Sequence, residues 1–533
     1  MPKVLLTSAY KPFDTFADGS NMMDLYAGRL AKNQDIFTLE CDYPAMPLYL
    51  IAQNISAPSV VLENPTWDDF TRELSRGYDY VGIHFAASLF FDRILRMCRY
   101  IKQHSPQTKI VLGSYGVVCL TQNFQEEQEL RSLVDHVCYG EGVRFMRELL
   151  GDPVDAPIRQ HFPPYYVRAL GVVKYPFNNL VSALGCNAGC EFCATSAFFK
   201  YKKVRLVSPA ELWEAMKAYL KERDYAFLWI FDEDFFADEA YAREFGRLVR
   251  SDPEVNPERV LWGGFASVRA LSRFSAEELV KMGVGALWIG IESKYSALPK
   301  RMGKDIQQVF DELHNAGITT IGSFIVGWDF HTPDNISEDV DHVVRLNPTY
   351  SQISSLMPCP GTRLWKRLEE EGRLRTQGFR WKNFNLYSAM HEHAHMTDEQ
   401  VFFWVDETMR RLFYTNGPSI LRTYEVYLNG YRSLKDNPDP FVQGRVRRLR
   451  KWCHIYRSGL LAIKVFAPSD AVRKKVDRMK KEHAELFGPV GPAIWCKSVI
   501  LLLVAACLKL RRKFPPRPRQ PRFRRFEYNG AGA

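Results

Sequence analysis

The first 150 residues alternate short apolar runs with amphipathic segments. The apolar runs predict strands at residues 4–7, 80–85, 109–113 and 134–139, and the segments between them predict helices at 22–32, 90–104 and 124–133. Buried strands separated by helices are typical of an open, parallel, doubly wound sheet, which binds ligands beyond the carboxyl ends of its strands. The loops expected there contain small or polar residues that let a bulky ligand approach the backbone, with ordinary turns as the alternative interpretation: Gly113, Ser114, Gly116, Gly140, Glu141 and Gly142.

Strand and helix signals resume after a proline-rich stretch at 151–178, which we interpret as a linker. Strands are predicted near 179–185, 226–231, 259–265, 286–291, 318–326 and 350–356, and the first helix between them is capped by Ser208 with Glu211 three residues later. Six such units are too few to close an eight-stranded barrel and predict an open, partial one. Its active site is expected at the carboxyl ends of the strands.

The remaining sequence is mainly helical and ends in an apolar segment followed by a basic tail. We therefore expect a Rossmann-like domain at 1–150, the linker, a partial barrel at 179–375, a helical region at 376–492 and an apolar helix with its tail at 493–533. The uninterrupted apolar part, 498–508, has 11 residues. That length is short of the ~20 residues needed to cross a bilayer.

The charge of the chain is concentrated in this tail. The net charge is +10, and residues 509–525 contain nine positive side chains and no acid, so the rest of the chain is nearly neutral. Eleven cysteines in 533 residues are too sparse for a disulfide scaffold, and the N-terminus carries no signal-peptide pattern. We expect a reducing cytosol, where clustered cysteines indicate metal or redox chemistry.

One cysteine cluster lies at the end of the first predicted barrel strand. Cys186, Cys190 and Cys193 fall within eight residues, and thiolates are the ligands of iron–sulfur clusters. Three protein ligands on a 4Fe–4S cluster leave one iron open for another molecule. A zinc knuckle with a remote fourth ligand and unrelated core cysteines are the alternatives.

The Cys-x3-Cys-x-aromatic-Cys pattern at this place resembles the radical S-adenosylmethionine (SAM) superfamily. The resemblance implies that the open iron chelates SAM, whose reductive cleavage yields a 5′-deoxyadenosyl radical, with a reductant such as flavodoxin or ferredoxin. Phe192 matches the aromatic residue of the motif. Later segments at 231–235, 267–269, 289–293 and 358–362 resemble the family's strand ends, and they imply SAM contacts from Ser267, Arg269 and Glu292. Cys359 stands where relatives commonly carry another residue, and a small buried side chain is its simpler interpretation.

The N-terminal half resembles the cobalamin-binding domain that precedes this barrel in a subgroup including hopanoid methylases and Mg-protoporphyrin oxidative cyclases. This implies cobalamin over Gly113, Ser114 and Gly116 and over Gly140, Glu141 and Gly142. The Asp-x-His-x-x-Gly motif, whose histidine ligates cobalt in many cobalamin proteins, is absent, and the first histidine is His84. Either cobalamin binds without a protein histidine or the domain has lost it.

A second motif, His391-Glu392-His393-Ala394-His395, matches the zinc-protease pattern His-Glu-x-x-His. That pattern places its two histidines on one face only within a helix. Thr397 and Gln400 form a predicted capping box, which starts the helix after the histidines. We therefore do not expect a zinc protease.

These features favour a radical SAM methylase that transfers a methyl group through cobalamin to an unactivated carbon. The subgroup also contains enzymes that cyclise or couple carbons of lipids or tetrapyrroles without methyl transfer, and some radical enzymes modify RNA. A short apolar helix with a polybasic tail is typical of an interfacial anchor on anionic lipid, and a buried helix with a solvated tail is the alternative. We expect a lipid substrate (hopanoid, isoprenoid or acyl chain), a cytoplasmic enzyme peripheral to the inner face of the membrane, and no nucleic-acid partner.

Overall fold

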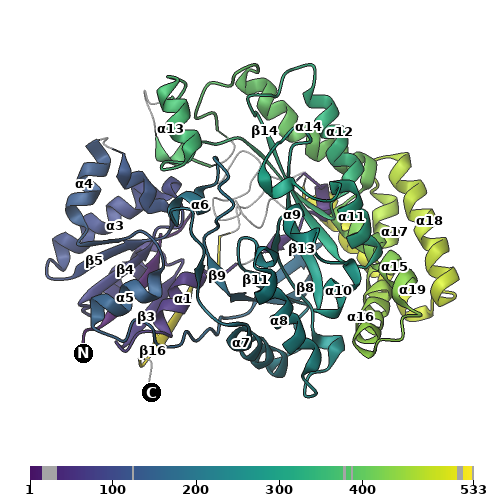
Figure 1. Ribbon diagram of the computed structural model, residues 1–533, viewed down its shortest axis with the longest axis horizontal. Coiled ribbons are helices and arrows are strands. Elements are labelled where there is room, and N and C mark those ends of the chain that lie inside the picture. The colour runs from purple at the N-terminus through teal and green to yellow at the C-terminus, as the bar shows by residue number, and fades with distance from the viewer. Residues whose placement is uncertain are drawn as a thin grey trace.

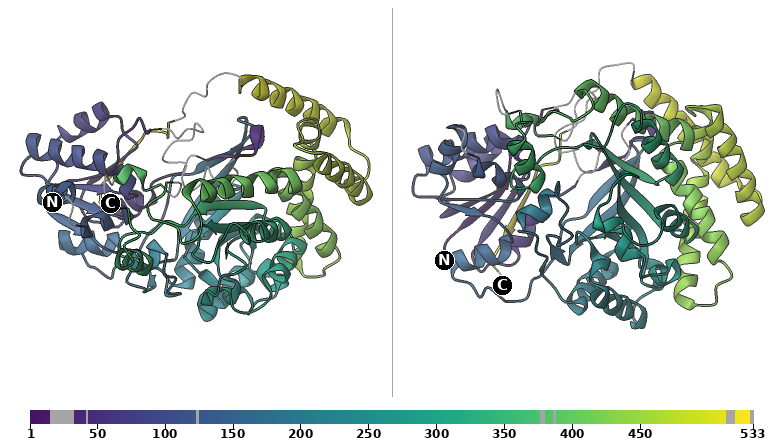
Figure 2. Two further views of the ribbon diagram at one scale, coloured as in Figure 1. Left: turned by 90° about the horizontal axis from the view of Figure 1, so that it is seen from above. Right: turned by 45° about the horizontal axis from the view of Figure 1, so that its top comes forward.

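The computed structural model describes residues 1–14, 33–41, 43–122, 125–375, 380–385, 388–512 and 520–530. Its three parts are an N-terminal α/β region, a curled half-barrel and a C-terminal group of helices (Figure 1). Figure 2 shows the N-terminal region and the C-terminal helices on opposite sides of the half-barrel. This arrangement confirms the expected mixed α/β fold class with a partial barrel and a helical C-terminal region.

The N-terminal sheet has the strand order β16-β3-β1-β4-β5-β6. All of its strands except β16 run parallel to one another. The four predicted strands are present as β1 (Val4–Ser8), β4 (Tyr80–His84), β5 (Lys109–Gly113) and β6 (His136–Cys138), and β3 (Ser59–Glu63) was not predicted. The helices here are α1 (Met46–Ala52), α2 (Trp67–Leu74), α3 (Phe91–His104), α4 (Gln125–Leu133) and α5 (Gly142–Leu150). The helix expected at 22–32 lies outside the described residues.

The half-barrel contains all six predicted parallel strands in sequence order. They are β8 (Val173–Val181), β11 (Phe227–Phe231), β12 (Trp262–Ala266), β13 (Val284–Glu292), β14 (Thr319–Val326) and β15 (Tyr350–Ser355). The helices between and after them are α6 (Ala194–Phe198), α7 (Pro209–Glu222), α8 (Glu239–Ser251), α9 (Val268–Leu271), α10 (Ala276–Lys281), α11 (Ile306–Asn315), α12 (Ile336–Leu346) and α13 (Arg363–Glu370). Ser208 and Glu211 form the predicted capping box of α7.

The expected linker at 151–178 needs a correction, because its second half belongs to the sheet. It contributes β7 (Tyr165–Ala169) and the start of β8, which pair antiparallel, and β2 (Glu40–Cys41) adds a further strand beside β7. Pro176 lies within β8, where its carbonyl accepts a hydrogen bond from Ala226 N (2.9 Å). The proline therefore removes only its own donor from the ladder.

The C-terminal helices pack against the half-barrel. They are α14 (Asp398–Asn416), α15 (Ser419–Leu434), α16 (Pro440–Arg457), α17 (Leu460–Val465), α18 (Asp470–Phe487) and α19 (Pro492–Arg511). Two buried arginines of α16 donate to carbonyls at the starts of barrel strands: Arg445 to Val284 O (2.7 Å) and Arg448 to Tyr225 O (2.7 Å). Because carbonyls of the strands satisfy these buried cations, the pairing fixes α16 at the amino ends of the strands.

The end of the basic tail belongs to the N-terminal sheet. Its residues Arg524–Tyr528 form β16, which pairs antiparallel with β3 at the edge of the N-terminal sheet. Arg524 forms an ion pair with buried Glu63 (2.9 Å), and Arg525 with buried Glu73 (2.8 Å). The sequence pattern showed only charge density, whereas the buried acids that pair with these arginines lie more than 450 positions earlier in the chain.

Helix α19 is also longer than the apolar run suggested. It extends over 20 residues, because Lys497 lies within it and Lys509 and Arg511 continue it beyond the apolar run. Within the described residues it is the one helix that is long and apolar enough to cross a membrane, judged by length and composition. Only 11% of its most apolar stretch is buried inside the protein. Trp495, with 65% of its surface exposed, and Leu503, with 61%, lie on its outer face.

Candidate active site

A single large cavity lies between the three parts of the fold. Its volume is about 2990 Å³, and it is lined by the carboxyl ends of the N-terminal strands, the inner face of the half-barrel and residues of α15, α16, α17 and α19. A pocket for one small molecule typically encloses roughly 300–1,000 Å³. The cavity therefore has room for several ligands side by side.

The three clustered cysteines line this cavity from the loop between β9 (Ala183–Leu184) and α6. Cys193 caps α6, and its N–H donates to the carbonyl of Cys190 (3.2 Å). Gly189 adopts φ +75°, a conformation that favours glycine and lets the loop turn between the cysteines. The loop thus presents all three thiols to one space.

The electrostatics of these thiols suit a cationic cluster. Burial raises the pKa of Cys186, and burial raises the pKa of Cys190 to about 11, opposed by the nearby ammonium of Lys300. The thiolate forms therefore need a positive partner. Among the described residues no three His, Cys, Asp or Glu side chains are close enough to surround one metal ion.

Glu292 lies at the end of β13, where a register shift and φ +58° turn its side chain into the cavity. Its Oε1 accepts a hydrogen bond from Lys300 Nζ, and its Oε2 is buried without a partner in the described chain. A Cβ on Gly290 would lie 2.3 Å from Oε1, so only glycine leaves room for the pair. Sequence reasoning identified Glu292 but missed Lys300, which has no motif around it.

The other expected SAM contacts lie at different places. Phe192 lines the cavity in edge-to-face contact with Trp328 (centroids 5.2 Å apart). Ser267 also lines it and caps the short helix α9. Arg269 is exposed and does not line the cavity. Its neighbours Val268 and Ala270 are buried, so residue 269 points outward in this structure, and a SAM contact from Arg269 stays a prediction.

Acidic residues at the end of β11 add a feature that the motif did not reveal. Asp232 is fully buried in ion pairs with Lys203 (2.5 Å) and Arg205 (2.9 Å). Asp234 accepts a hydrogen bond from Ser267 N (3.1 Å). Glu233 lines the cavity, and burial beside Asp232 raises its pKa to about 7. Glu233 can therefore exchange a proton near neutral pH.

The glycine loops of the N-terminal sheet form the opposite wall of the cavity. Five of the six expected residues line it, namely Gly113, Ser114, Gly140, Glu141 and Gly142. Gly116 does not line the cavity. A Cβ on Gly116 would lie 2.3 Å from Phe85, so the packing against Phe85 requires glycine at this position. Glu141 caps α5 by accepting from Val143 N (2.6 Å) and Arg144 N (2.9 Å). Gly140 adopts φ +145° with open space around it.

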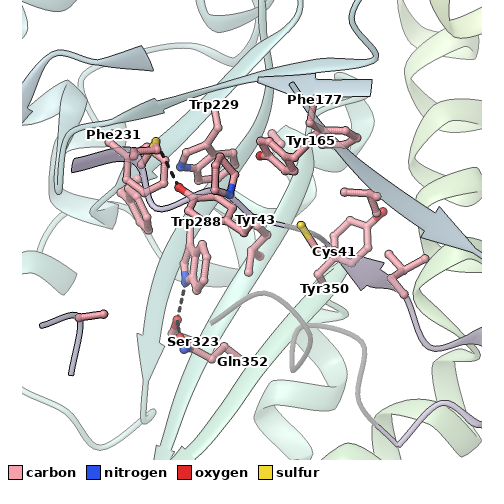
Figure 3. Close-up of a pocket in the computed structure, with 18 of the residues that line it drawn as sticks. Cys41, Tyr43, Tyr165, Phe177, Trp229, Phe231, Trp288, Ser323, Tyr350 and Gln352 are labelled. Carbon is pink, nitrogen blue, oxygen red and sulfur yellow. Dashed lines mark hydrogen bonds between the residues drawn. The ribbon is translucent and has the colours of Figure 1, made fainter. Parts of the chain in front are cut away.

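The interior of the half-barrel is lined mainly by aromatic rings (Figure 3). Trp288 stands edge-on to Trp229 (6.3 Å between centroids), and its indole N–H donates to Ser323 Oγ (2.5 Å). Ser323 donates in turn to Gln352 Oε1 (3.1 Å). We name the space lined by Trp229, Trp288, Ser323 and Gln352 the aromatic chamber. No sequence motif indicated it, because its residues come from separate strands.

Two sequence features remain to be placed, the histidine motif and Cys359. Thr397 and Gln400 form the capping box that starts α14, so His391 and His393 precede the helix, as predicted. His393 contacts Gly327 O through Nδ1 (3.2 Å), and both histidines have pKa values lowered by burial. Cys359 lines the cavity, and burial raises its pKa to about 12.

Comparison with known families identifies the barrel. Residues 180–343 match the model of the Radical SAM superfamily. The half-barrel is therefore a radical SAM domain, and the protein is an enzyme of this chemistry, as the cysteine motif predicted. A 4Fe–4S cluster and SAM are the cofactors of that domain.

Individual relatives are methyltransferases. An uncharacterized methyltransferase of Pyrococcus horikoshii is 24% identical over 379 residues, which are 64% of this chain and 80% of the relative. A structure of the radical SAM methyltransferase TsrM from Kitasatospora setae, with tryptophan substrate and the SAM analogue aza-SAM bound, aligns with a TM-score of 0.50 at 14% identity, covering 70% of this chain and 76% of that chain. A second TsrM structure, with cobalamin and a [4Fe-4S] cluster bound, covers 84% of this chain and 99% of that chain with a TM-score of 0.49 at 13% identity.

Proposed function

We propose that this radical SAM enzyme is a cobalamin-dependent methyltransferase that acts on an unactivated carbon of a hydrophobic, lipid-type substrate. The observation that carries the proposal is the shared cavity. The cysteine loop, the glycine loops of the N-terminal sheet and the aromatic chamber all face one space of about 2990 Å³. A methyl donor, a radical initiator and a substrate can therefore meet without crossing bulk water.

Cys186, Cys190 and Cys193 would hold the cluster, which supplies the electron that cleaves SAM when both are bound. The chain's own residues prepare the place for SAM. The partnerless oxygen of Glu292 would accept a hydrogen bond from the amino group of SAM, and Lys300, which donates to the other oxygen of Glu292, would offer a donor to its carboxylate. Phe192, which packs against Trp328, gives this side of the cavity an apolar surface that would keep water away from a radical.

Cobalamin would lie over the glycine loops, where it supplies a transferable methyl group. The support is the open space at Gly140 and the absence of a side chain at Gly113, which lets a large ligand approach the carboxyl edge of the sheet. The uncharacterized methyltransferase and TsrM agree with methyl transfer.

The aromatic chamber supports a hydrophobic substrate. Beside its two indole rings lie further aromatic rings that line the same cavity, those of Tyr43, Tyr165, Phe177, Phe231 and Tyr350 (Figure 3). Apolar residues of α19 also line the cavity at Ile500, Leu501 and Leu508, so its apolar lining continues to the helix with the exposed apolar face. A lipid could enter along this side, with the enzyme peripheral on the inner face of the membrane and a flavodoxin or ferredoxin as reductant.

The test compares lipid extracts of cells with and without the gene by mass spectrometry, followed by assay with purified enzyme. We expect a lipid heavier by one methyl group only where the gene is present, and 5′-deoxyadenosine formation coupled to its appearance. Formation of 5′-deoxyadenosine with a cyclised or coupled lipid and no methyl transfer would replace methylation by the cyclase alternative. A modified RNA and unchanged lipids would overturn the lipid substrate.

A further inference from the structure

His84 occupies the centre of the carboxyl edge of the N-terminal sheet. It is the last residue of β4, paired in register with Ser8 of β1 on one side and with Gly113 of β5 on the other. Its side chain lines the large cavity, on the same face as Gly82 two residues earlier. The histidine therefore stands among the loops that we assign to cobalamin.

The imidazole of His84 is uncommitted. Within the described residues its ring nitrogens have no hydrogen-bond or ion-pair partner. Burial lowers the pKa of His84 to about 4, so the ring is neutral at physiological pH. A neutral imidazole keeps a nitrogen lone pair at physiological pH, and this is the form in which histidine binds metals. An enclosed, neutral and unpaired ring nitrogen that faces a cavity has the properties of a metal ligand.

Neighbouring groups do not compete for this role. Cys138 also lines the cavity, but burial and the charge of Glu141 raise its pKa to about 12, so it remains a thiol. Its Sγ contacts the carbonyls of Gly140 and Glu141 (both 3.8 Å). Glu141 itself is used as the cap of α5.

The space beside the ring fits a broad, flat ligand. Gly113, directly opposite His84 in the register, has no side chain, and a methyl group added there would have Cys138 as its nearest neighbour, at 3.5 Å. A methyl group added at Gly140 would have nothing within 4 Å. The strand ends beside His84 therefore leave room for a broad macrocycle.

We propose that His84 supplies the axial nitrogen ligand to the cobalt of cobalamin bound over these loops. This rests on the cobalamin part of the proposed function. It assigns to the end of β4 the role that the absent Asp-x-His-x-x-Gly motif would have assigned to the loop after the first strand. Nitrogen donors of imidazole suit first-row transition metals such as cobalt.

The experiment uses cob(II)inamide, which lacks the nucleotide base of cobalamin and so brings no axial nitrogen of its own. The purified full-length protein is loaded anaerobically, and its electron paramagnetic resonance spectrum is recorded. We expect each cobalt line to split into a triplet from one nitrogen nucleus. Protein grown with histidine labelled with the heavy nitrogen isotope should show doublets instead.

His84→Ala should still bind cob(II)inamide through the glycine loops but lose the splitting, and added imidazole should restore it. His136→Ala is the matched control, since His136 lies on β6 of the same sheet and does not line the cavity. Binding without nitrogen splitting in the unaltered protein would overturn the inference and leave the proposed function intact. Failure to bind either cob(II)inamide or cobalamin would overturn both.

Discussion

Lys300 donates a hydrogen bond to Oε1 of Glu292, while Oε2 of the same carboxylate is buried without a partner in the described chain. Only one of the two carboxylate oxygens therefore has a hydrogen-bond partner. A buried carboxylate oxygen without a partner is costly in free energy unless a ligand donates a hydrogen bond to it. An ammonium beside a carboxylate complements the two charges of an amino acid. The pair therefore suits the methionyl end of SAM.

Glu292→Gln should weaken SAM binding by roughly tenfold to a hundredfold, because a charge-assisted hydrogen bond contributes about 1.5–3 kcal/mol. Equilibrium dialysis with cluster-reconstituted protein measures this. Glu277→Gln removes the acid of the exposed Glu277–Lys281 pair and is the control, with unchanged affinity. Equal affinity of both variants would remove Glu292 from the SAM site.

Single Cys→Ala changes at 186, 190 and 193 should each abolish reductive SAM cleavage and lower the iron content from about four per chain towards zero. Iron analysis and 5′-deoxyadenosine formation provide the measurements. Cys359→Ala is a demanding control, because Cys359 lines the same cavity and should retain both properties. If Cys359→Ala loses iron as completely as the others, the ligand set is not the three-cysteine loop.

Substitutions in the glycine loop should separate ligand loss from misfolding. Gly113→Ala adds a methyl group at ordinary contact distance and should keep cobalamin, whereas Gly113→Phe should fill the space above the strand end and remove the visible absorption bands of bound cobalamin. Both should keep the melting temperature. Gly116→Ala would collide with Phe85 and should lower it instead. Cobalamin retained by Gly113→Phe would contradict this binding site.

The sequence predicted the elements of this fold better than the way they are joined. The six barrel strands and the capping boxes at Ser208 and Thr397 depend on local patterns, and the structure contains them. Strand β16 depends on Glu63 and Glu73, which are distant in sequence, so the arginines of the tail looked unpaired. The Pro-rich composition of 151–178 likewise concealed β7, whose partner is β8.

The same distinction holds for the site. The cysteine loop was recognisable because its three ligands lie within eight residues. Lys300 and the aromatic chamber were not, since they gain meaning only when strands far apart in sequence lie side by side. Arg269 is the opposite case, because a motif position predicts a SAM contact, whereas its side chain on the short helix α9 is exposed and does not line the cavity.

The chamber's hydrogen-bond chain predicts how substrates are distinguished. Trp288 donates a hydrogen bond to Ser323, and the hydroxyl of Ser323 donates to Gln352 Oε1. The amide NH2 of Gln352 is left without a partner in the described residues. A flat apolar ligand with an acceptor should therefore bind better than one without. We expect fluorenone to bind about fivefold more tightly than fluorene, because one neutral hydrogen bond contributes about 1 kcal/mol to binding. Quenching of tryptophan fluorescence measures both affinities.

Gln352→Leu should abolish that preference by weakening fluorenone binding alone. Gln443→Leu, on α16, is the control and should keep it, since Gln443 does not line the cavity. This binding assay needs no cluster, SAM or cobalamin. Equal binding of the two compounds by the unaltered protein would show that Gln352 does not select the substrate.

The exposed face of α19 predicts attachment to lipid. Trp495, Ile500, Leu503 and Leu510 are each more than half exposed, whereas Ser498 and Ala505 on the other face are buried against the C-terminal helices. Tail charges contribute less than their number suggests, since Arg524 and Arg525 pair with buried acids and Lys509 pairs with Asp35. Attachment should therefore depend mainly on apolar contact.

Flotation with liposomes containing anionic lipid tests this. Truncation before α19 would also remove β16 and leave Glu63 and Glu73 without their arginines, so point variants are preferable. The combined change Trp495→Gln, Ile500→Gln and Leu503→Gln keeps a helix-forming residue at each position and should abolish flotation. The control, Phe403→Gln with Val465→Gln, removes exposed apolar side chains from α14 and α17 and should float like the unaltered chain. Flotation that is unchanged in the triple variant but lost in high salt would assign attachment to the tail's charges instead, because salt screens exposed charges and leaves apolar burial in place.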